Sequence, residues 1–111
     1  MAAYFRLQDV IEVTGTKAQD RANVIDIGSY RHLSFQVRVF NLAATTGTLY
    51  LQTSAVNEEE AWLDIPNITV NLTNSAEANK LLVAGDVLRF VRWRVGNVNA
   101  TARFLIDLVA R

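Results

Sequence analysis

The stretch LSFQVRV (residues 33–39) alternates apolar and polar side chains without a break. Successive side chains of a β-strand point to opposite faces of a sheet, so the odd-numbered residues of this stretch share one face and the even-numbered residues share the other. This pattern predicts a strand with one face in the core and one in water, which is typical of antiparallel sheets. The stretch therefore indicates an all-β fold.

Segments with the same period of two recur on both sides of this stretch, separated by short turn-like breaks. They cover residues 4–13, 23–27, 48–55, 61–65, 68–73, 87–95 and 102–108. We expect residues 33–39 and 48–55 to form a hairpin, and residues 75–82 to form a helical turn or a loop. The chain is thus predicted to be a single domain over residues 1–111, an antiparallel two-sheet β-sandwich of about eight strands. Its topology is expected to be jelly-roll or immunoglobulin-like.

The stretch VLRFVRWRV (residues 87–95) departs from simple alternation in its middle. The apolar residues share one inward face only if the alternation shifts by one residue between Phe90 and Val91. A β-bulge would cause this shift, because it adds one unpaired residue to the strand. This predicts that Phe90, Val91 and Trp93 lie in the core. The three arginines of the stretch would then point outward. They are Arg89, Arg92 and Arg94.

The charge balance argues against a general nucleic-acid or membrane-surface binder. Eleven basic residues match eleven acidic ones, so no net field draws the chain to a polyanion. A net charge of zero also removes long-range repulsion between copies. The first ten residues lack the apolar core of a signal peptide, and no apolar run is long enough to span a bilayer, so we expect neither that secretion route nor membrane insertion.

The sequence contains no assembled motif for catalysis or for a cofactor. It has no cysteine and a single histidine, His32, which we expect to serve a surface role at the entrance of a strand. Neither a P-loop nor an HExxH motif occurs, and we expect no cofactor, no metal and no enzymatic activity. The acidic run at residues 58–60 favours a solvated loop or one half of an electrostatic contact over a calcium site, because consecutive side chains rarely converge on one ion.

The outward-facing side chains suggest a surface rich in arginine and tyrosine. Nine of the eleven cations are arginine, and Arg and Tyr are enriched at protein interfaces whereas Lys is depleted. Both a solvated face with acidic cross-strand partners and a protein interface fit this pattern. The interface candidates are Arg38, Tyr50, Glu58, Glu59, Glu60, Arg89, Arg92, Arg94 and Arg103. In an alternative hypothesis the chain is a lectin-like carbohydrate-binding module in which exposed Trp62 or Tyr50 stacks on a sugar.

Several stretches together resemble the small β-sandwich virion proteins of tailed bacteriophages over residues 20–111. They are DIGSYR (26–31) leading into LSFQVRV, LYLQTS (49–54), the acidic loop with Trp62, VLRFVRWRV, and ARFLIDLVAR (102–111). The resemblance implies a non-enzymatic structural protein, either a capsid decoration or cement protein that binds the shell as symmetric copies, or a neck, tail or baseplate component. It implies copies of itself and a major capsid or other virion protein as partners. The expected location is the virion, after synthesis in the host bacterial cytoplasm, with the acidic loop and the outward arginines as complementary patches.

Overall fold

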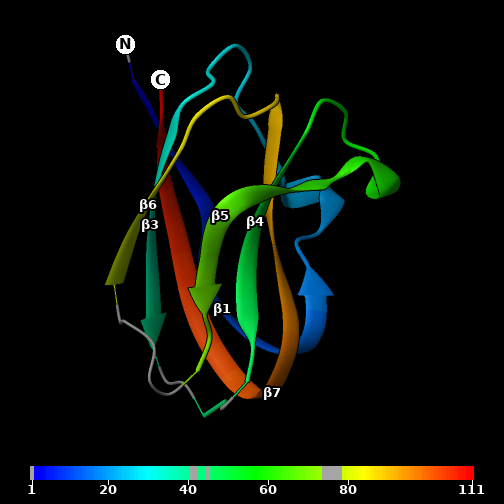
Figure 1. The fold of residues 1–111 in the computed structure, drawn as a ribbon, viewed down its shortest axis with the longest axis vertical. Coiled ribbons are helices and arrows are strands. Elements are labelled where there is room, and N and C mark those ends of the chain that lie inside the picture. Colours follow the sequence, from blue (N-terminus) through cyan, green and yellow to red (C-terminus); the bar gives the residue numbers. More distant parts are fainter. Residues whose placement is uncertain (1, 41–42, 45, 74–78) are drawn as a thin grey trace.

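The computed structural model describes residues 2–40, 43–44, 46–73 and 79–111, and its fold is all-β and antiparallel, as predicted (Figure 1). Seven strands of this described part form one sheet. They are β1 (Ala3–Ala18), β2 (Ile25–Asp26), β3 (Leu33–Phe40), β4 (Thr48–Ser54), β5 (Leu63–Asn71), β6 (Asn79–Ala84) and β7 (Phe90–Ala110). Two 3-10 turns, η1 (Arg21–Asn23) and η2 (Glu59–Ala61), lie between strands. Within the described residues, no helix has the length and apolar character needed to cross a membrane.

The long strand β7 organises the sheet, because it pairs along both of its edges. Val91 pairs with Ile25 of β2 and with Thr53 of β4, and farther along, Leu108 pairs with β1 and with β3. One edge of β7 therefore carries β1 and β2, while the other carries β4 along its first part and β3 along its second. The order across the sheet is β5-β4-β7-β3-β6.

This arrangement makes one nearly closed, barrel-like sheet, and the predicted eight-stranded, two-sheet sandwich is not confirmed. The strands β5 and β6 are the two ends of the path, and Lys80 Nζ donates a hydrogen bond to the Thr69 carbonyl oxygen between them at 3.4 Å. The predicted hairpin of β3 with β4 is wrong. Each of these strands pairs with β7 instead.

The barrel depends on a bend shared by β1 and β7, which both turn at the lower end of the molecule in Figure 1. The register there is Val13 with Ala102, Gly15 with Val98 and Lys17 with Val95. Each step of two residues on β1 thus matches a longer step on β7, and such bulges bend a strand and increase its twist. Gly15 and Asn97 have φ values of +81° and +57°, which place both in the left-handed region.

Gly47 is packed against this bend, and we predict that Gly47→Ala destabilises the fold. Its φ is +147°, and an added Cβ would lie 2.9 Å from Val98 Cγ2 and 3.1 Å from Val98 Cα. Backbone strain and overlap together should lower the free energy of unfolding by about 2 kcal/mol, measured by urea denaturation. Gly15→Ala is the matched control, because its φ is also positive but nothing lies within 4 Å of the added Cβ. Equal losses in the two variants would contradict a role for the close approach to Val98.

The core lies inside the barrel and is filled by the inward faces that alternation predicted. Phe35 of β3, Trp93 and Phe104 of β7, and Leu51 of β4 are all buried. The rings of Trp93 and Phe104 meet edge to face, with centroids 5.1 Å apart, so the first and second parts of β7 contact each other across the core. The predicted burial of Val91 and Trp93 is confirmed.

The predicted bulge between Phe90 and Val91 is wrong. The pairing of β7 with β4 runs in continuous register from Phe90 onward, and the strand begins at Phe90. Val87 is buried before the strand begins, and Leu88 is exposed. Phe90 is only partly buried and lies under the Arg89 guanidinium, 5.1 Å from its ring centroid. The buried residues Val87, Val91 and Trp93 are all odd-numbered, so the alternation needs no change of phase in this stretch.

Two further expectations were wrong at strand boundaries. The segments 61–65 and 68–73 were expected as separate strands, but β5 runs through Pro66 as an edge strand, where the missing N–H of proline is tolerated. Asn67 has a φ of +63°, and the β4–β5 register shifts between Tyr50 and Gln52. Residues 79–82, expected in a helical turn or loop, belong to β6. The rest of that predicted segment, residues 75–78, lies outside the described residues.

Candidate interaction surfaces

The first candidate surface is the outer face of β4 and the first part of β7, which we call the arginine face. It comprises Tyr50, Gln52, Arg92 and Arg94, with Trp62 and Asp64 beside them. Tyr50 pairs across the strands with Arg94, whose guanidinium lies 3.9 Å from the Tyr50 ring centroid. Arg94 also forms an ion pair with Asp64 at 3.0 Å, and this hydrogen-bonded partner lowers the pKa of Asp64.

Arg92 points away from the core, as predicted, but it is buried rather than available to a partner. Its side chain is only 6% exposed, and its guanidinium lies 4.6 Å from the Trp62 ring centroid. Its Nε donates a hydrogen bond to Gln52 Oε1 at 2.8 Å, and its Nη1 lies 3.6 Å from Glu59 Oε1. Burial lowers the pKa of Arg92, while Glu59 opposes that effect. Arg92 thus anchors the segment that carries η2.

In the sugar-binding hypothesis Trp62 or Tyr50 stacks on a sugar, but each of these rings has an arginine stacked on it. One face of Tyr50 and one face of Trp62 each carry a guanidinium, so neither ring offers both faces to a sugar. Trp93 is in the core and offers none. Tyr50 and Trp62 therefore each have one face covered by an arginine.

The remaining interface candidates among the arginines also have acidic partners within the chain. Arg89 pairs with Asp26 at 2.8 Å, and Arg103 pairs with Glu12 at 3.2 Å. The hydrogen bonds from Arg89 lower the pKa of Asp26. Exposed pairs of this kind contribute little to stability. Arg89, Arg94 and Arg103 therefore each pair with an acidic residue from another strand.

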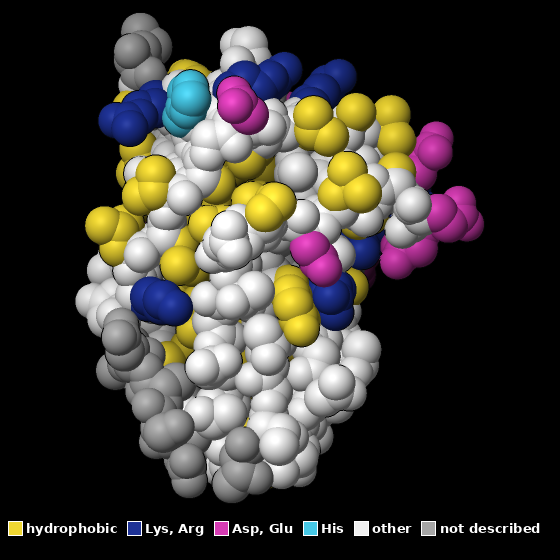
Figure 2. Space-filling view, viewed as in Figure 1, with side chains coloured by type: hydrophobic (Ala, Val, Ile, Leu, Met, Phe, Trp, Pro, Cys, Tyr) yellow, Lys and Arg dark blue, Asp and Glu magenta, His cyan; other side chains and the backbone are white. Residues whose placement is uncertain are grey.

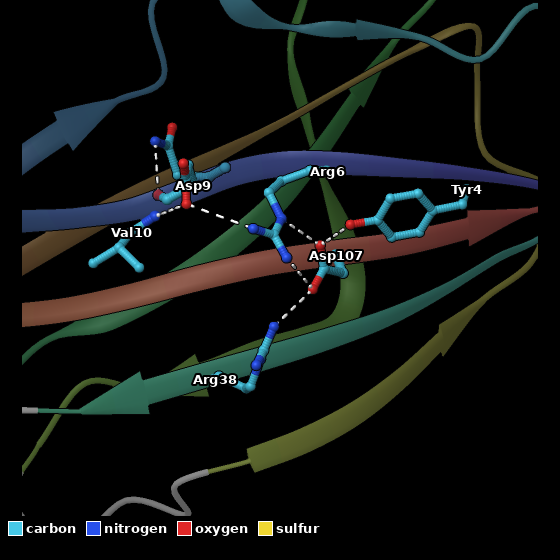
Figure 3. Close-up of polar contacts among 7 residues, drawn as sticks. Tyr4, Arg6, Asp9, Val10, Arg38 and Asp107 are labelled. Carbon is cyan, nitrogen blue, oxygen red and sulfur yellow. Dashed lines mark hydrogen bonds and ion pairs between the residues drawn. The ribbon is translucent and has the colours of Figure 1, made fainter.

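The second candidate surface surrounds Asp107 on the outer face of β1, the second part of β7, and β3 (Figure 3). We call this set the Asp107 cluster; it comprises Tyr4, Arg6, Arg38 and Asp107. Tyr4 Oη donates to Asp107 Oδ1 at 2.6 Å, and Arg6 Nε donates to the same oxygen at 2.8 Å. Arg38 Nη2 and Arg6 Nη2 donate to Oδ2 at 3.1 and 3.3 Å.

The electrostatics of the Asp107 cluster follow from these contacts. The hydrogen bond from Arg6 is the largest cause that lowers the pKa of Asp107, and Asp107 raises the pKa of Arg6 in return. Two guanidinium groups share one carboxylate. Asp9 lies near Arg6 Nη1 at 3.6 Å, on the side away from Arg38 in Figure 3. The carboxylates of Asp107 and Asp9 therefore balance the charges of Arg6 and Arg38, and Arg38 has Asp107 as its acidic partner.

A groove of about 540 Å³ runs over this face, and we call it the sheet groove. Tyr4 of β1 and Leu81 of β6 line it, together with Ser34, Gln36 and Asp107. Large apolar side chains on this face are exposed rather than buried. They are Tyr4 at 61%, Leu81 at 70%, Val83 at 60% and Val109 at 43%. Cross-strand pairing places Val109 beside Tyr4, and Ser34 separates Val109 from Val83. Exposed apolar side chains grouped on one face are typical of an interaction site.

The acidic residues Glu58, Glu59 and Glu60 form the third surface, together with Val56. We call residues 56–60 the acidic loop. All three carboxylates are exposed, and the Asp and Glu side chains gather on the projecting right edge in Figure 2. Arg21 Nη2 donates to the Asn57 carbonyl oxygen at 2.7 Å, and Asn57 Nδ2 donates back to the Arg21 carbonyl at 3.2 Å, which ties the loop to the segment near η1. Across the described chain, no ion pair involves Glu58 or Glu60.

Sequence reasoning missed most of the sheet groove. Arg38 was identified as an interface candidate, but its neighbours Tyr4, Arg6 and Asp107 were not. One signal was present, because Asp107 is a lone carboxylate in the apolar run FLIDLVA (104–110), and a buried carboxylate requires a partner. Leu81 was missed because LLV (81–83) has no period of two. His32 is exposed, and in the described ranges no three His, Asp or Glu side chains are placed to hold a metal ion.

The fold and these surfaces define a small all-β protein with polar clusters and exposed apolar side chains on its outer faces. No family model matches the sequence, and no curated protein is similar to it at a significant level.

Solved structures show the same fold at low sequence identity. The SPBc2 prophage-derived protein YomS has a TM-score of 0.57 and 10% identity, covering 100% of this chain and 94% of that one. A protein of Bacillus endospore appendages, described as disulfide-linked pili, has a TM-score of 0.51 and 14% identity, covering 99% of this chain and 88% of that one. The PBSX exported protein XepA has a TM-score of 0.49 and 18% identity, covering 99% of this chain and 34% of that one, which is too weak a similarity to establish a shared fold.

Proposed function

We propose that this chain is a non-enzymatic structural protein of a bacteriophage particle, and specifically a capsid decoration protein that binds the shell as symmetric copies. The observation that carries the proposal is the similarity in fold to a prophage-derived protein, which extends over 100% of this chain and 94% of YomS. Such agreement over both chains supports a common architecture. At 10% identity the similarity supports the fold, and the role in the particle is our inference.

The surfaces of the molecule support a binding role. The sheet groove exposes apolar side chains from three strands, and the acidic loop projects Glu58 and Glu60, which have no ion-pair partner among the described residues. Both are suited to contacts between proteins, whether with a shell or with another copy. Of the predicted interface arginines, Arg38 and Arg94 are partly exposed and accessible, whereas Arg92 is buried beneath the segment that carries η2.

The location in the particle can be tested directly. We would purify particles of a phage that encodes this chain, separate heads from tails, and quantify the chain by mass spectrometry. We expect it in the head fraction at a fixed ratio to the major capsid protein. Heads from a phage lacking the gene should bind the purified protein saturably. Enrichment in tails would replace the decoration role with a neck, tail or baseplate role, and absence from particles, combined with binding on a glycan array, would overturn the proposal.

A further inference from the structure

We propose that copies of this chain associate head to tail, with the acidic loop of one copy seated in the sheet groove of the next. This inference rests on the proposed function in one respect, namely that the protein works as multiple copies. It names the partner of both surfaces as a second molecule of the same chain.

The positions of the two surfaces require that such a contact be intermolecular. In Figure 1, η2 lies at the right side of the molecule, whereas β3 and β6, which contribute residues to the sheet groove, lie at the left. Glu59 is held on its own side by the buried Arg92, and Asn57 is held by Arg21. The loop of one molecule therefore cannot reach its own groove.

The charges of the two surfaces are complementary. The acidic loop presents Glu58 and Glu60, for which no ion pair occurs in the described part of the chain. Beside the groove, Arg38 and Arg6 share the carboxylate of Asp107, Arg6 also lies near Asp9, and the Arg38 side chain is 42% exposed. Arg38 shares its acidic partner with Arg6, so a carboxylate from a neighbouring copy would give the exposed Arg38 guanidinium a second partner. Complementary potentials of this kind give specificity and steer encounters.

The apolar parts of the two surfaces are complementary as well. Val56 projects from the acidic loop with 45% of its surface exposed, and Leu63 is exposed where β5 leaves η2. The groove offers Tyr4, Leu81 and Val109 as apolar partners. Contact between these groups would remove apolar surface from water on both sides, which is the main driving force for association. The zero net charge of the chain adds no long-range repulsion against it.

A contact between two different surfaces is heterologous, and this has a geometric consequence. Each copy keeps one free loop and one free groove after a single contact, so assembly continues until a ring closes or a filament grows. A symmetric dimer, such as one formed by edge-to-edge pairing of two β6 strands, would stop at two copies. The two arrangements therefore make different predictions for mixtures of variants.

The test uses one variant of each surface, measured by sedimentation velocity over a concentration series. The loop variant is Val56→Asn with Glu58→Gln and Glu60→Gln, and the groove variant is Leu81→Asp, which places a negative charge where the acidic loop would bind. We expect the wild type to grow in mass with concentration, and each variant alone to associate at least about tenfold more weakly. High salt should weaken the wild-type contact, because exposed charges are screened.

The decisive measurement is an equimolar mixture of the two variants. The loop variant retains a working groove and the groove variant retains a working loop, so the mixture should form a 1:1 heterodimer and grow no further. Val10→Asp is the matched control for Leu81→Asp, because Val10 is also an exposed apolar residue on a strand but does not line the groove. It should associate as the wild type does.

Two results would overturn head-to-tail association: a wild type that stays a single copy at every concentration, or a variant mixture that forms no heterodimer. Circular dichroism of each variant checks that the fold is retained. Particle composition is measured separately. A chain that is found in heads but is monomeric in solution would contradict this inference alone, and a chain that assembles head to tail but is absent from particles would contradict the proposed function alone.

Discussion

Replacing Trp93 by alanine is expected to lower the free energy of unfolding by about 4 kcal/mol, the largest effect we predict for a single side chain. Trp93 is 1% exposed, and its ring packs edge to face against Phe104. Its Nε1 donates a hydrogen bond to Gln8 Oε1 at 2.9 Å, which ties β7 to β1. The substitution removes the ring, leaves a cavity in the barrel, and leaves the Gln8 acceptor without this donor. Urea denaturation followed by far-ultraviolet circular dichroism measures the change.

Two comparison variants separate the contributions of the ring and the hydrogen bond. Trp93→Phe keeps an aromatic ring and loses the indole N–H, so we expect a loss of about 2 kcal/mol. Trp62→Ala removes the other tryptophan, which is only partly buried and lies outside the core, and should cost less than Trp93→Ala. A loss below about 1 kcal/mol in Trp93→Ala would contradict the central position of this side chain in the core.

The faces of the strands could be predicted from the sequence because alternation is a local property. Phe35, Val37 and Trp93 were assigned to the core from the alternation of apolar and polar residues alone, and all three are buried in the structure. The pairing of strands could not be predicted in this way. Residues 33–39 and 48–55 are neighbours in sequence, yet β3 and β4 both pair with β7, which is distant in the chain. That pairing depends on long-range contacts that periodicity does not contain.

The burial of Arg92 illustrates a second limit of sequence reasoning. The alternation of residues placed Arg92 on the outer face of its strand, and this prediction is correct. The further expectation that Arg92 is exposed there is wrong. An outer face is exposed only where no other segment covers it, and here Trp62 and Glu59, from the segment between β4 and β5, lie over the guanidinium. The acidic partners of the other arginines could not be predicted from the sequence either, because they depend on the register between strands.

The second prediction with a large expected effect concerns the Asp107 cluster, where a nearly buried carboxylate has arginine partners on two other strands. Asp107→Asn keeps the shape of the side chain but removes the charge that Arg6 and Arg38 share, and leaves their guanidinium groups to repel each other. The Asp107 side chain is only 12% exposed, while both arginines are partly exposed and partly solvated. We therefore expect a loss of about 2 kcal/mol at pH 7, less than for a fully buried pair. Urea denaturation at that pH measures it.

The dependence of this loss on pH tests its electrostatic origin. The pKa of Asp107 is lowered in the folded protein, whereas an unfolded Asp has a pKa of about 3.9. The stabilisation by Asp107 is thus fully present above the unfolded-state pKa and is lost as the pH falls through the lower folded-state pKa. The stability curves of the wild type and Asp107→Asn should therefore converge in acid. Glu12→Gln, which removes the exposed partner of Arg103, should change stability by less than about 0.5 kcal/mol at any pH. If the two curves stayed parallel down to the most acidic pH at which the protein folds, Asp107 would stabilise the barrel through packing and not through its charge.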